Sequence, residues 1–357
     1  MDQTQSSICY SELMNSSESS LFRNEFEKNV KGFNRLPQHI LLKIFSHLNE
    51  KDLHTVQQVC QRWKQGALNP SLWKNLKIQK LRTTGSVNMA LQKIWMFGQL
   101  EKVYIKDVIE ASALLRQVYR CLPNLQYLII RYCNNLSAQT VRAVLRKCKQ
   151  LKMLDLKGTT FKDSSIFDEL PRLNYLKILN LSDNGNLTTK DMVDISLNCR
   201  NLEEFYVSSI RYDSSREQLT DEDCSFIVSN MSNNLKGFFI DGATLTDQCF
   251  QIKNNALNAV AECCPKLKKL IIKSCKNITD ISCLQKCDSL AILNIAFCLK
   301  LSIDNFLPIQ ASIHIIFVDN GENLKKLEAS LKEMPSNIKI RICHSQFRKS
   351  FEDYRIV

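Results

Sequence analysis

The sequence predicts an α/β fold, in which a small helical unit is followed by a curved solenoid with parallel strands on its concave face and helices on its convex face. The first observation behind this prediction is a strand-like L-x-x-L-x-L pattern that returns every 25 or 26 residues from Leu100. It continues at wider and then narrower intervals, so that its first apolar residues are Leu100, Leu125, Leu151, Leu176, Leu202, Leu235, Leu267, Leu290 and Ile313. Such a period indicates stacked units, because one repeat cannot bury its own apolar face.

The second observation is a change of pattern near the N-terminus. Residues 1–31 include seven serines and few apolar residues, which predicts a disordered tail. Residues 32–80 instead carry apolar residues at helical spacing, with Pro37 suited to a first helical turn and Asn49 to the start of a second helix. So small a unit cannot hide all its large apolar side chains, which predicts that a partner covers some of them.

The helical segment resembles the F-box over about 45 residues. The motif runs through Leu36-Pro37, Ile40-Leu41, Ile44-Phe45, Leu48, Asp52-Leu53, Val59-Cys60-Gln61-Arg62-Trp63 and Leu72-Trp73. Gln38 and His54 depart from the usual residues without removing an apolar anchor. The resemblance implies contact with the Skp adaptor through Leu36, Pro37, Ile40, Ile44, Phe45, Leu53, Val59, Cys60 and Trp63, of which about half are expected only to hold the F-box together.

The repeats span residues 100–343, in about nine to ten units, after a linker or capping half-repeat at 81–99. Each runs from a strand through a polar turn and a helix to Cys-x-x-Leu, and the units resemble the cysteine-containing leucine-rich repeat. Two longer repeats carry extra residues near 212–222 and 246–255, where solenoids often bind partners. The tail at 344–357 is expected either to cap the last repeat or to fold over the concave face.

The chain has 15 cysteines, and their regular positions favour buried structural thiols over disulfides or metal ligands. No pair of Cys-x-x-Cys units occurs at zinc spacing, and no catalytic motif is present. We therefore expect no catalytic residues, no metal and no cofactor, although the sequence leaves open whether a small molecule sits in the cup of the repeats.

The net charge of +12 is distributed along the chain rather than concentrated on one helix or stripe. This distribution favours a solvated basic surface, and nucleic-acid binding is the less favoured alternative. The longest apolar runs fall well short of the roughly 20 residues that cross a bilayer, and no signal peptide is evident. We expect a soluble protein of the cytoplasm or nucleus, without a membrane partner.

The substrate face is predicted from the pleat, because side chains alternate along a strand and the leucines point inward. The alternate positions then place basic and aromatic residues at the N-terminal end of the concave face, acidic residues in the middle and aromatic residues at the C-terminal end. Exposed aromatic side chains are typical interface anchors. We therefore predict a substrate path along Tyr132, Tyr206, Phe239, Phe297 and Phe317, with even odds that several of them pack internally.

An F-box followed by leucine-rich repeats resembles the FBXL class of substrate receptors in SCF (Skp–cullin–F-box) ubiquitin ligases. The resemblance implies a non-catalytic subunit that binds the Skp adaptor and, through it, the cullin and the ring-type ligase subunit. The repeats would then hold a protein substrate for ubiquitination and proteasomal degradation. The alternative is an adaptor-bound scaffold that assembles or stabilises a partner without ubiquitin transfer.

Overall fold

The computed structural model describes residues 35–161, 164–184, 187–208, 219–231, 234–241, 252–301, 313–319, 325 and 339–343. The chain divides into two compact units, Met1–Lys74 and Asn75–Val357. The sheet of the second unit begins at Asn75, so the last residues of the segment predicted as helical belong to the repeats. The predicted tails at 1–31 and 344–357, and most of the two insertions, lie outside the described residues.

The first unit is a cluster of short helices whose order follows the predicted motif. Its elements are α2 (Gln38–Phe45), α3 (Glu50–Val56), α4 (Gln61–Ala67) and the 3-10 turn η1 (Pro70–Leu72). Pro37 precedes α2, and the Asn49 side chain accepts hydrogen bonds from two backbone amides at the start of α3. Leu41 and Phe45 are buried and pack against Gly66, where an added Cβ would lie 3.2 Å from the Phe45 ring.

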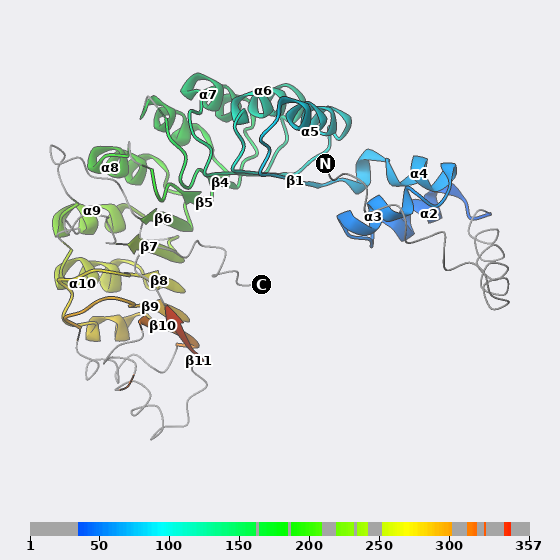
Figure 1. Ribbon diagram of the computed structural model, residues 1–357. Coiled ribbons are helices and arrows are strands. Elements are labelled where there is room, and N and C mark those ends of the chain that lie inside the picture. Colours follow the sequence, from blue (N-terminus) through cyan, green and yellow to red (C-terminus); the bar gives the residue numbers. More distant parts are fainter. Residues whose placement is uncertain are drawn as a thin grey trace, which may run out of the picture. The chain divides into compact units, whose positions relative to one another are not determined.

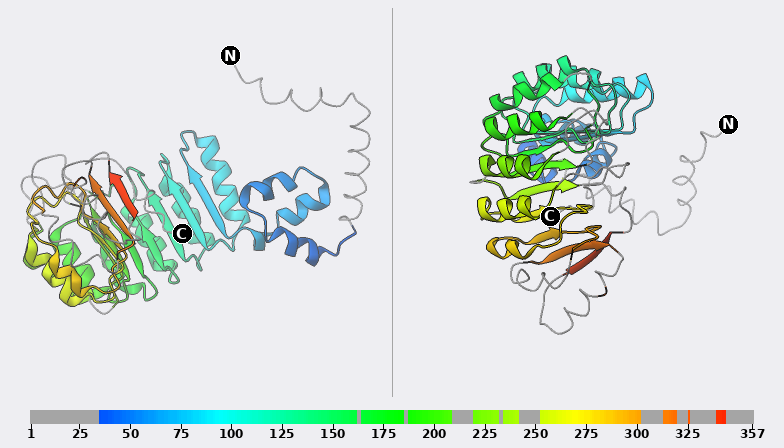
Figure 2. Two further views of the ribbon diagram at one scale, coloured as in Figure 1. Left: turned by 90° about the horizontal axis from the view of Figure 1, so that it is seen from below. Right: turned by 90° about the vertical axis from the view of Figure 1, so that its left-hand side faces the viewer.

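The second unit is built on one parallel sheet whose described strands lie in chain order (Figure 1). The strands are β1 (Asn75–Gln79), β2 (Lys102–Lys106), β3 (Tyr127–Arg131), β4 (Met153–Asp155), β5 (Ile178–Asn180), β6 (Glu204–Ser208), β7 (Gly237–Asp241), β8 (Lys269–Ile271), β9 (Ile292–Asn294), β10 (Ile315–Asp319) and β11 (Lys339–Cys343). Figure 2 shows the strands stacked one after another. This arrangement confirms the predicted α/β solenoid.

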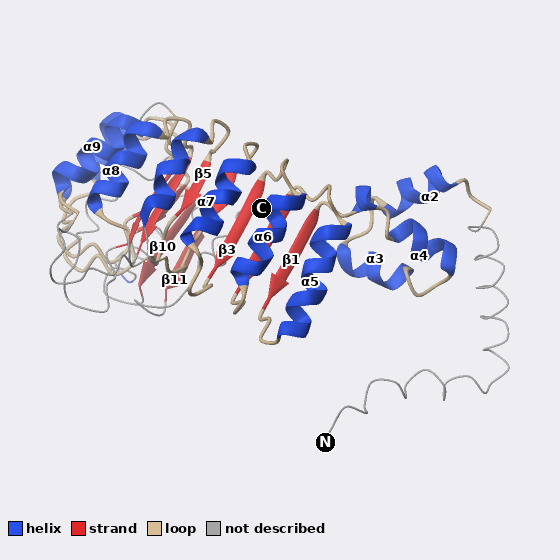
Figure 3. Ribbon diagram, turned by 90° about the horizontal axis from the view of Figure 1, so that it is seen from above, coloured by secondary structure: helices blue, strands red, loops and turns tan. Residues whose placement is uncertain are grey.

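Helices cover one side of this sheet and leave the other side to the concave surface (Figure 3). They are α5 (Thr84–Met96), α6 (Ala111–Cys121), α7 (Ala138–Lys147), η2 (Ser164–Arg172), α8 (Thr189–Asn198), α9 (Asp221–Met231), α10 (Asn254–Cys263) and η3 (Ser282–Lys286). Their starts are set by local polar residues, because Ser137 caps α7 and Thr188 forms a capping box with Asp191 at α8. In the described part of the chain, no helix could cross a membrane.

The core lies between the sheet and the helices and is formed by the repeated leucines. Leu128, Leu154 and Leu179 are register partners on neighbouring strands, and none of them has measurable exposure. The cysteines that cap α7 and α8 share this core, since Cys148 and Cys199 are buried and form no disulfide. Burial raises the pKa of both thiols to about 12, so they remain protonated near neutral pH, as expected of structural cysteines.

A tight bend follows the strands, and its backbone is left-handed at one repeated position. The residues with positive φ at this position are Lys80, Asp107, Tyr132, Gly158, Asp183, Ser274 and Phe297. For a residue other than glycine this conformation costs roughly 1–2 kcal/mol. Hydrogen bonds between neighbouring bends offset that cost, for example from the Tyr132 amide to the Lys157 carbonyl at 2.9 Å. The bends thus fix two aromatic residues, Tyr132 and Phe297, at the end of the strands.

Candidate functional site: two interaction surfaces

The first candidate surface is the face of α2 in the F-box unit. Ile40 is partly exposed, and Ile44, one turn further along the helix, is 37% exposed. Leu36 is partly exposed and Pro37 is exposed, just before the helix. These four apolar residues lie on α2 or directly before it, each with part of its surface exposed, and we call them the apolar edge. Large apolar groups left at a surface in this way are typical of a protein-binding face.

The other predicted adaptor residues are more enclosed. Phe45 is 2% exposed and Leu53 is 3% exposed, which places both in the core of the unit rather than on its surface. Trp63 is partly exposed and packs edge-on against Phe45, with 5.6 Å between the ring centroids. Val59 and Cys60 are also partly exposed. Phe45 and Leu53 therefore hold the F-box unit together from its core, consistent with the expectation that about half of the nine residues have this role.

The second candidate surface is the concave face of the sheet, where strand register aligns residues into rows. The central row contains Lys77, Tyr104, Ile129, Asp155, Asn180, Tyr206, Phe239, Ile271, Asn294, Phe317 and Arg341. Adjacent positions along each strand hold the buried leucines, so this row points away from the core. Its members nevertheless differ widely in exposure, from the fully buried Asp155 to the exposed Lys77.

The middle of the concave face contains a buried polar network. The Asp155 carboxylate accepts hydrogen bonds from Nε and Nη2 of Arg131 at 2.9 and 2.7 Å. It also accepts one from the side chain of Asn180 at 3.2 Å and one from the backbone amide of Lys157 at 3.0 Å. The network neutralises a buried charge and ties three neighbouring strands together. Arg131, Asp155 and Asn180 lie on the predicted substrate face, but their side chains bind one another.

The next residues of the row form an apolar cluster. Tyr206 and Phe239 stack with their ring centroids 3.8 Å apart, and Ile271 and Ile178 pack beside them. Each of the two rings is only 4% exposed, so our expectation that they present exposed anchors is corrected by the structure. The physical reason is that neighbouring strands lie about 4.8 Å apart, close enough for flat rings in register to cover one another.

Polar contacts hold this cluster in place. The Tyr206 hydroxyl donates a hydrogen bond to the carboxylate of Glu204, and burial raises the pKa of that hydroxyl. Glu204 is also 3.0 Å from the ammonium of Lys269, although a whole strand lies between their own strands. The intervening register position is Gly237, which has no side chain to separate them. An added Cβ there would lie 3.0 Å from the Phe239 ring and 3.2 Å from Glu204 Cγ.

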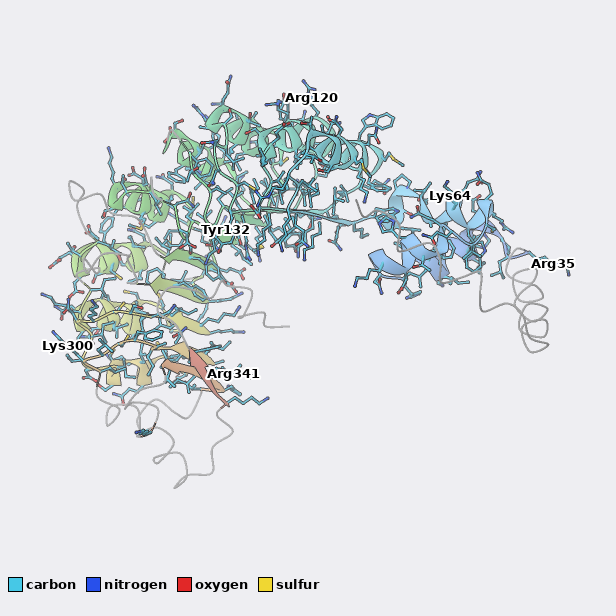
Figure 4. The ribbon with its side chains drawn as sticks, in the orientation of Figure 1. Arg35, Lys64, Arg120, Tyr132, Lys300 and Arg341 are labelled. Carbon is cyan, nitrogen blue, oxygen red and sulfur yellow. The ribbon has the colours of Figure 1, made fainter. Side chains whose placement is uncertain are left out.

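The remaining predicted aromatic residues stay at the surface, because Tyr132, Phe297 and Phe317 are each partly exposed. Figure 4 shows Tyr132 on the strand side of the domain and Arg120 on the outer helices. The Tyr132 ring lies over Gly158, where an added Cβ would be 2.5 Å from a ring carbon. Lys106 Nζ lies 5.7 Å from the centroid of the Tyr132 ring, and Lys273 Nζ lies 5.7 Å from the centroid of the Phe297 ring.

Sequence reasoning missed the pairing of these lysines with the rings. Lys77 and Tyr104 are register partners on β1 and β2, with 5.4 Å between the ammonium and the ring centroid. The available signal was the spacing, because Lys77 occupies in its strand the position that Tyr104 occupies in the next one. The pairing of Lys77 with Tyr104 was not predicted, because β1 lies before the first predicted repeat. Among the described residues, no cluster of three side chains could hold a metal ion.

Comparisons with known proteins agree with both parts of the chain. A family described as F-box-like matches residues 33–79. An F-box/LRR-repeat protein of Arabidopsis thaliana is 24% identical over 219 residues, which cover 50% of this chain and 48% of that protein. F-box/LRR-repeat protein 5 of Mus musculus is 26% identical over 211 residues, covering 48% of this chain and 30% of that protein. The chain thus matches less than half the length of these relatives.

A shorter match has a higher identity. The ubiquitin ligase complex F-box protein UFO1 of Saccharomyces cerevisiae is 45% identical over 49 residues, or 14% of this chain and 7% of that protein. Among solved structures, an internalin of Listeria monocytogenes aligns over 82% of this chain and 88% of its own, with 15% identity and a TM-score of 0.44. The helices of residues 38–67 carry the segment that matches the F-box-like family and precede a parallel sheet of leucine-rich repeats, and in this order of parts the chain is similar to F-box/leucine-rich-repeat proteins.

Proposed function

We propose that this protein is the non-catalytic substrate receptor of an SCF-type ubiquitin ligase. The observation that carries the proposal is the apolar edge formed by Leu36, Pro37, Ile40 and Ile44, which lies within the segment that matches the F-box. An edge of this kind suits the Skp adaptor, which would link the chain to the cullin and the ring-type subunit. The similarity to an F-box protein named for a ubiquitin ligase complex supports the same partners.

In this role the chain contributes proximity rather than chemistry. The F-box anchors the receptor, the repeats hold a protein substrate, and other subunits transfer ubiquitin in the cytoplasm or nucleus. Holding two reactants together raises their effective concentration, which is how a receptor without catalytic residues accelerates a reaction. The surface residues Tyr132, Phe297 and Phe317 are proposed to line the substrate path, supported by the buried pair Tyr206 and Phe239.

Adaptor binding is tested by changing Leu36 and Pro37 together to alanine in the full chain. Truncation of a central interface anchor costs about 2 kcal/mol or more, so the double variant should lose the adaptor and the cullin on co-purification. The Arg62 guanidinium donates a hydrogen bond to the backbone carbonyl of Leu36, which alanine retains. The F-box should therefore remain folded, which thermal melting by circular dichroism checks.

The matched control is Lys64→Ala, because Lys64 is exposed on α4 of the same unit and lies outside the apolar edge. This variant should retain the adaptor. Undiminished adaptor binding by the Leu36/Pro37 variant would refute the proposal. The scaffold alternative is separated by substrate turnover: a partner that accumulates when the adaptor site is lost is a substrate, whereas a scaffolded partner keeps its abundance or declines.

A further inference from the structure

We propose that the first three strands of the concave face bind an acidic peptide segment of the substrate. The surface consists of Lys77, Lys102, Lys106, Tyr104, Tyr127 and Tyr132, and we call it the basic–tyrosine surface. The inference rests on the proposed function in one respect, namely that the repeats bind a protein. It adds the chemical class of the segment that is bound.

The charge of this surface is one-sided. Strands β1, β2 and β3 have the sequences NLKIQ, KVYIK and YLIIR, which contain three lysines, one arginine and no acidic residue. The charge of Arg131 is neutralised by Asp155. Asp107, which follows β2, is 2.6 Å from Arg82 rather than paired with a strand lysine. Lys77 and Lys102 are exposed, and Lys106 is partly exposed. The exposed Lys77 and Lys102 thus present positive charge to a ligand over these strands.

The tyrosines position these cations. Lys77 lies 5.4 Å from the ring of Tyr104, and Lys106 lies 5.7 Å from the ring of Tyr132, in each case one repeat further along. Lys102 and Tyr127 are register partners on β2 and β3. A lysine held over an aromatic face loses less conformational freedom when a ligand binds. The half-exposed tyrosine hydroxyls can donate hydrogen bonds to carboxylates beside the ammonium groups.

The dimensions suit a short peptide. Three adjacent strands span roughly 10 Å, and the four-residue separation between Lys102 and Lys106 spans about 13 Å. An extended peptide covers that distance with three or four residues. A protein that makes about 6–10 phosphate contacts on nucleic acid needs a longer basic track. The track ends at β4, because Asp155 neutralises Arg131 and Glu204 pairs with Lys269 further on.

The test measures fluorescence anisotropy of a labelled peptide of alternating glutamate and serine, titrated with the full chain. A peptide with glutamine in place of glutamate and an oligouridylate of the same length are the comparison probes. The glutamate peptide should bind at least about tenfold more tightly than the glutamine peptide, with an affinity that falls as salt is raised. Replacement of Lys77, Lys102 and Lys106 together by glutamate should abolish the preference.

The matched control replaces Arg116, Lys147 and Lys190 by glutamate, because these exposed residues lie on the convex helices and change the net charge equally. This variant should bind the glutamate peptide like the native chain. A triple glutamine variant of the three strand lysines, which should also lose the preference, guards against misfolding of the charge-reversed protein. Melting curves confirm that each variant is folded.

Equal binding of the glutamate and glutamine peptides, absence of peptide binding, or equal losses in the strand and helix variants would overturn the inference. Tighter binding of the oligouridylate, lost in the strand variant, would assign the surface to nucleic acid instead. Adaptor co-purification is measured on the same preparations. If the adaptor is retained while the peptide is not bound, only the acidic-segment inference fails; if the native chain lacks the adaptor, the receptor proposal fails independently of the peptide result.

Discussion

The start and the middle of one row on the concave face behave in opposite ways. At β1 and β2 the row presents the exposed Lys77 and the partly exposed Tyr104, whereas at β6 and β7 it buries Tyr206 and Phe239. All four residues occupy the same position in the pleat. What differs is the neighbour in register: at β1 and β2 a lysine lies over a tyrosine ring, whereas at β6 and β7 two rings stack on each other. The repeat position fixes the direction of a side chain, and the adjacent repeats fix its exposure.

The largest expected effect lies at the buried polar network between these two regions. Asp155→Ala leaves the Arg131 guanidinium buried without its carboxylate, which should lower the free energy of unfolding by about 3–5 kcal/mol. Lys77→Ala, in the same row but exposed, should change it by less than about 0.5 kcal/mol. Urea denaturation followed by circular dichroism measures both values.

A double variant sharpens this result. Replacement of a buried ion pair by apolar residues is often neutral, so Arg131→Met with Asp155→Leu should recover more than half of the loss. If Asp155→Ala proves as mild as Lys77→Ala, the contrast between the buried and exposed parts of the row is wrong.

The next effect concerns the stacked rings. Phe239→Ala removes a buried ring that packs on Tyr206 and Ile271, and should cost about 3 kcal/mol of stability. Phe317→Ala is the matched control, because Phe317 is in the same row but partly exposed, and about 1 kcal/mol is expected. Similar losses in urea denaturation would mean that the middle of the face is no more tightly packed than its end.

The smallest effect is expected at the bend that carries Tyr132. Gly158→Ala places a Cβ at φ +65° and against the Tyr132 ring, which should cost about 1–2 kcal/mol and displace the ring. Gly85→Ala is the control, because an added Cβ in that helical position meets nothing within 4 Å. It should be neutral or slightly stabilising.

The same pair of variants separates stability from binding. If Tyr132 contributes to the basic–tyrosine surface, Gly158→Ala should lower the affinity for the acidic peptide in the anisotropy assay, whereas Gly85→Ala should leave that affinity unchanged. Unchanged peptide affinity in a folded Gly158→Ala protein would remove Tyr132 from that surface.

Much of the fold could be predicted from the sequence. The leucine period predicted the parallel solenoid, and the regular cysteines predicted buried thiols, because both follow from repeated contacts within one unit and its neighbour. The strand β1 was missed since Leu76 and Ile78 lie within the segment predicted as helical, before the leucine pattern starts at Leu100. A single apolar alternation of five residues is too short to distinguish an edge strand from a turn after a helix.

The substrate path could be predicted only in part. Pleat alternation placed all five aromatic residues on the concave side, yet it could not tell that Tyr206 and Phe239 would cover each other. It also places Arg131, Asp155 and Asn180 on that side, although these side chains bind one another across three strands. Direction depends on the residue's own strand, whereas exposure depends on side chains roughly 25 residues away in the sequence.

The sequence by itself therefore determined the F-box motif, the period of the repeats and the face on which each strand residue lies, because those features depend on local spacing. Only the tertiary structure decided which concave residues remain available to a partner. Register brings Lys77 to Tyr104, Arg131 close to Asp155 and Tyr206 to Phe239. Each pairing decides whether the charge or the apolar area of these side chains is buried or exposed at the surface. The exposure of these side chains is therefore a tertiary property, because it depends on distances between strands that the chain connects only through intervening helices.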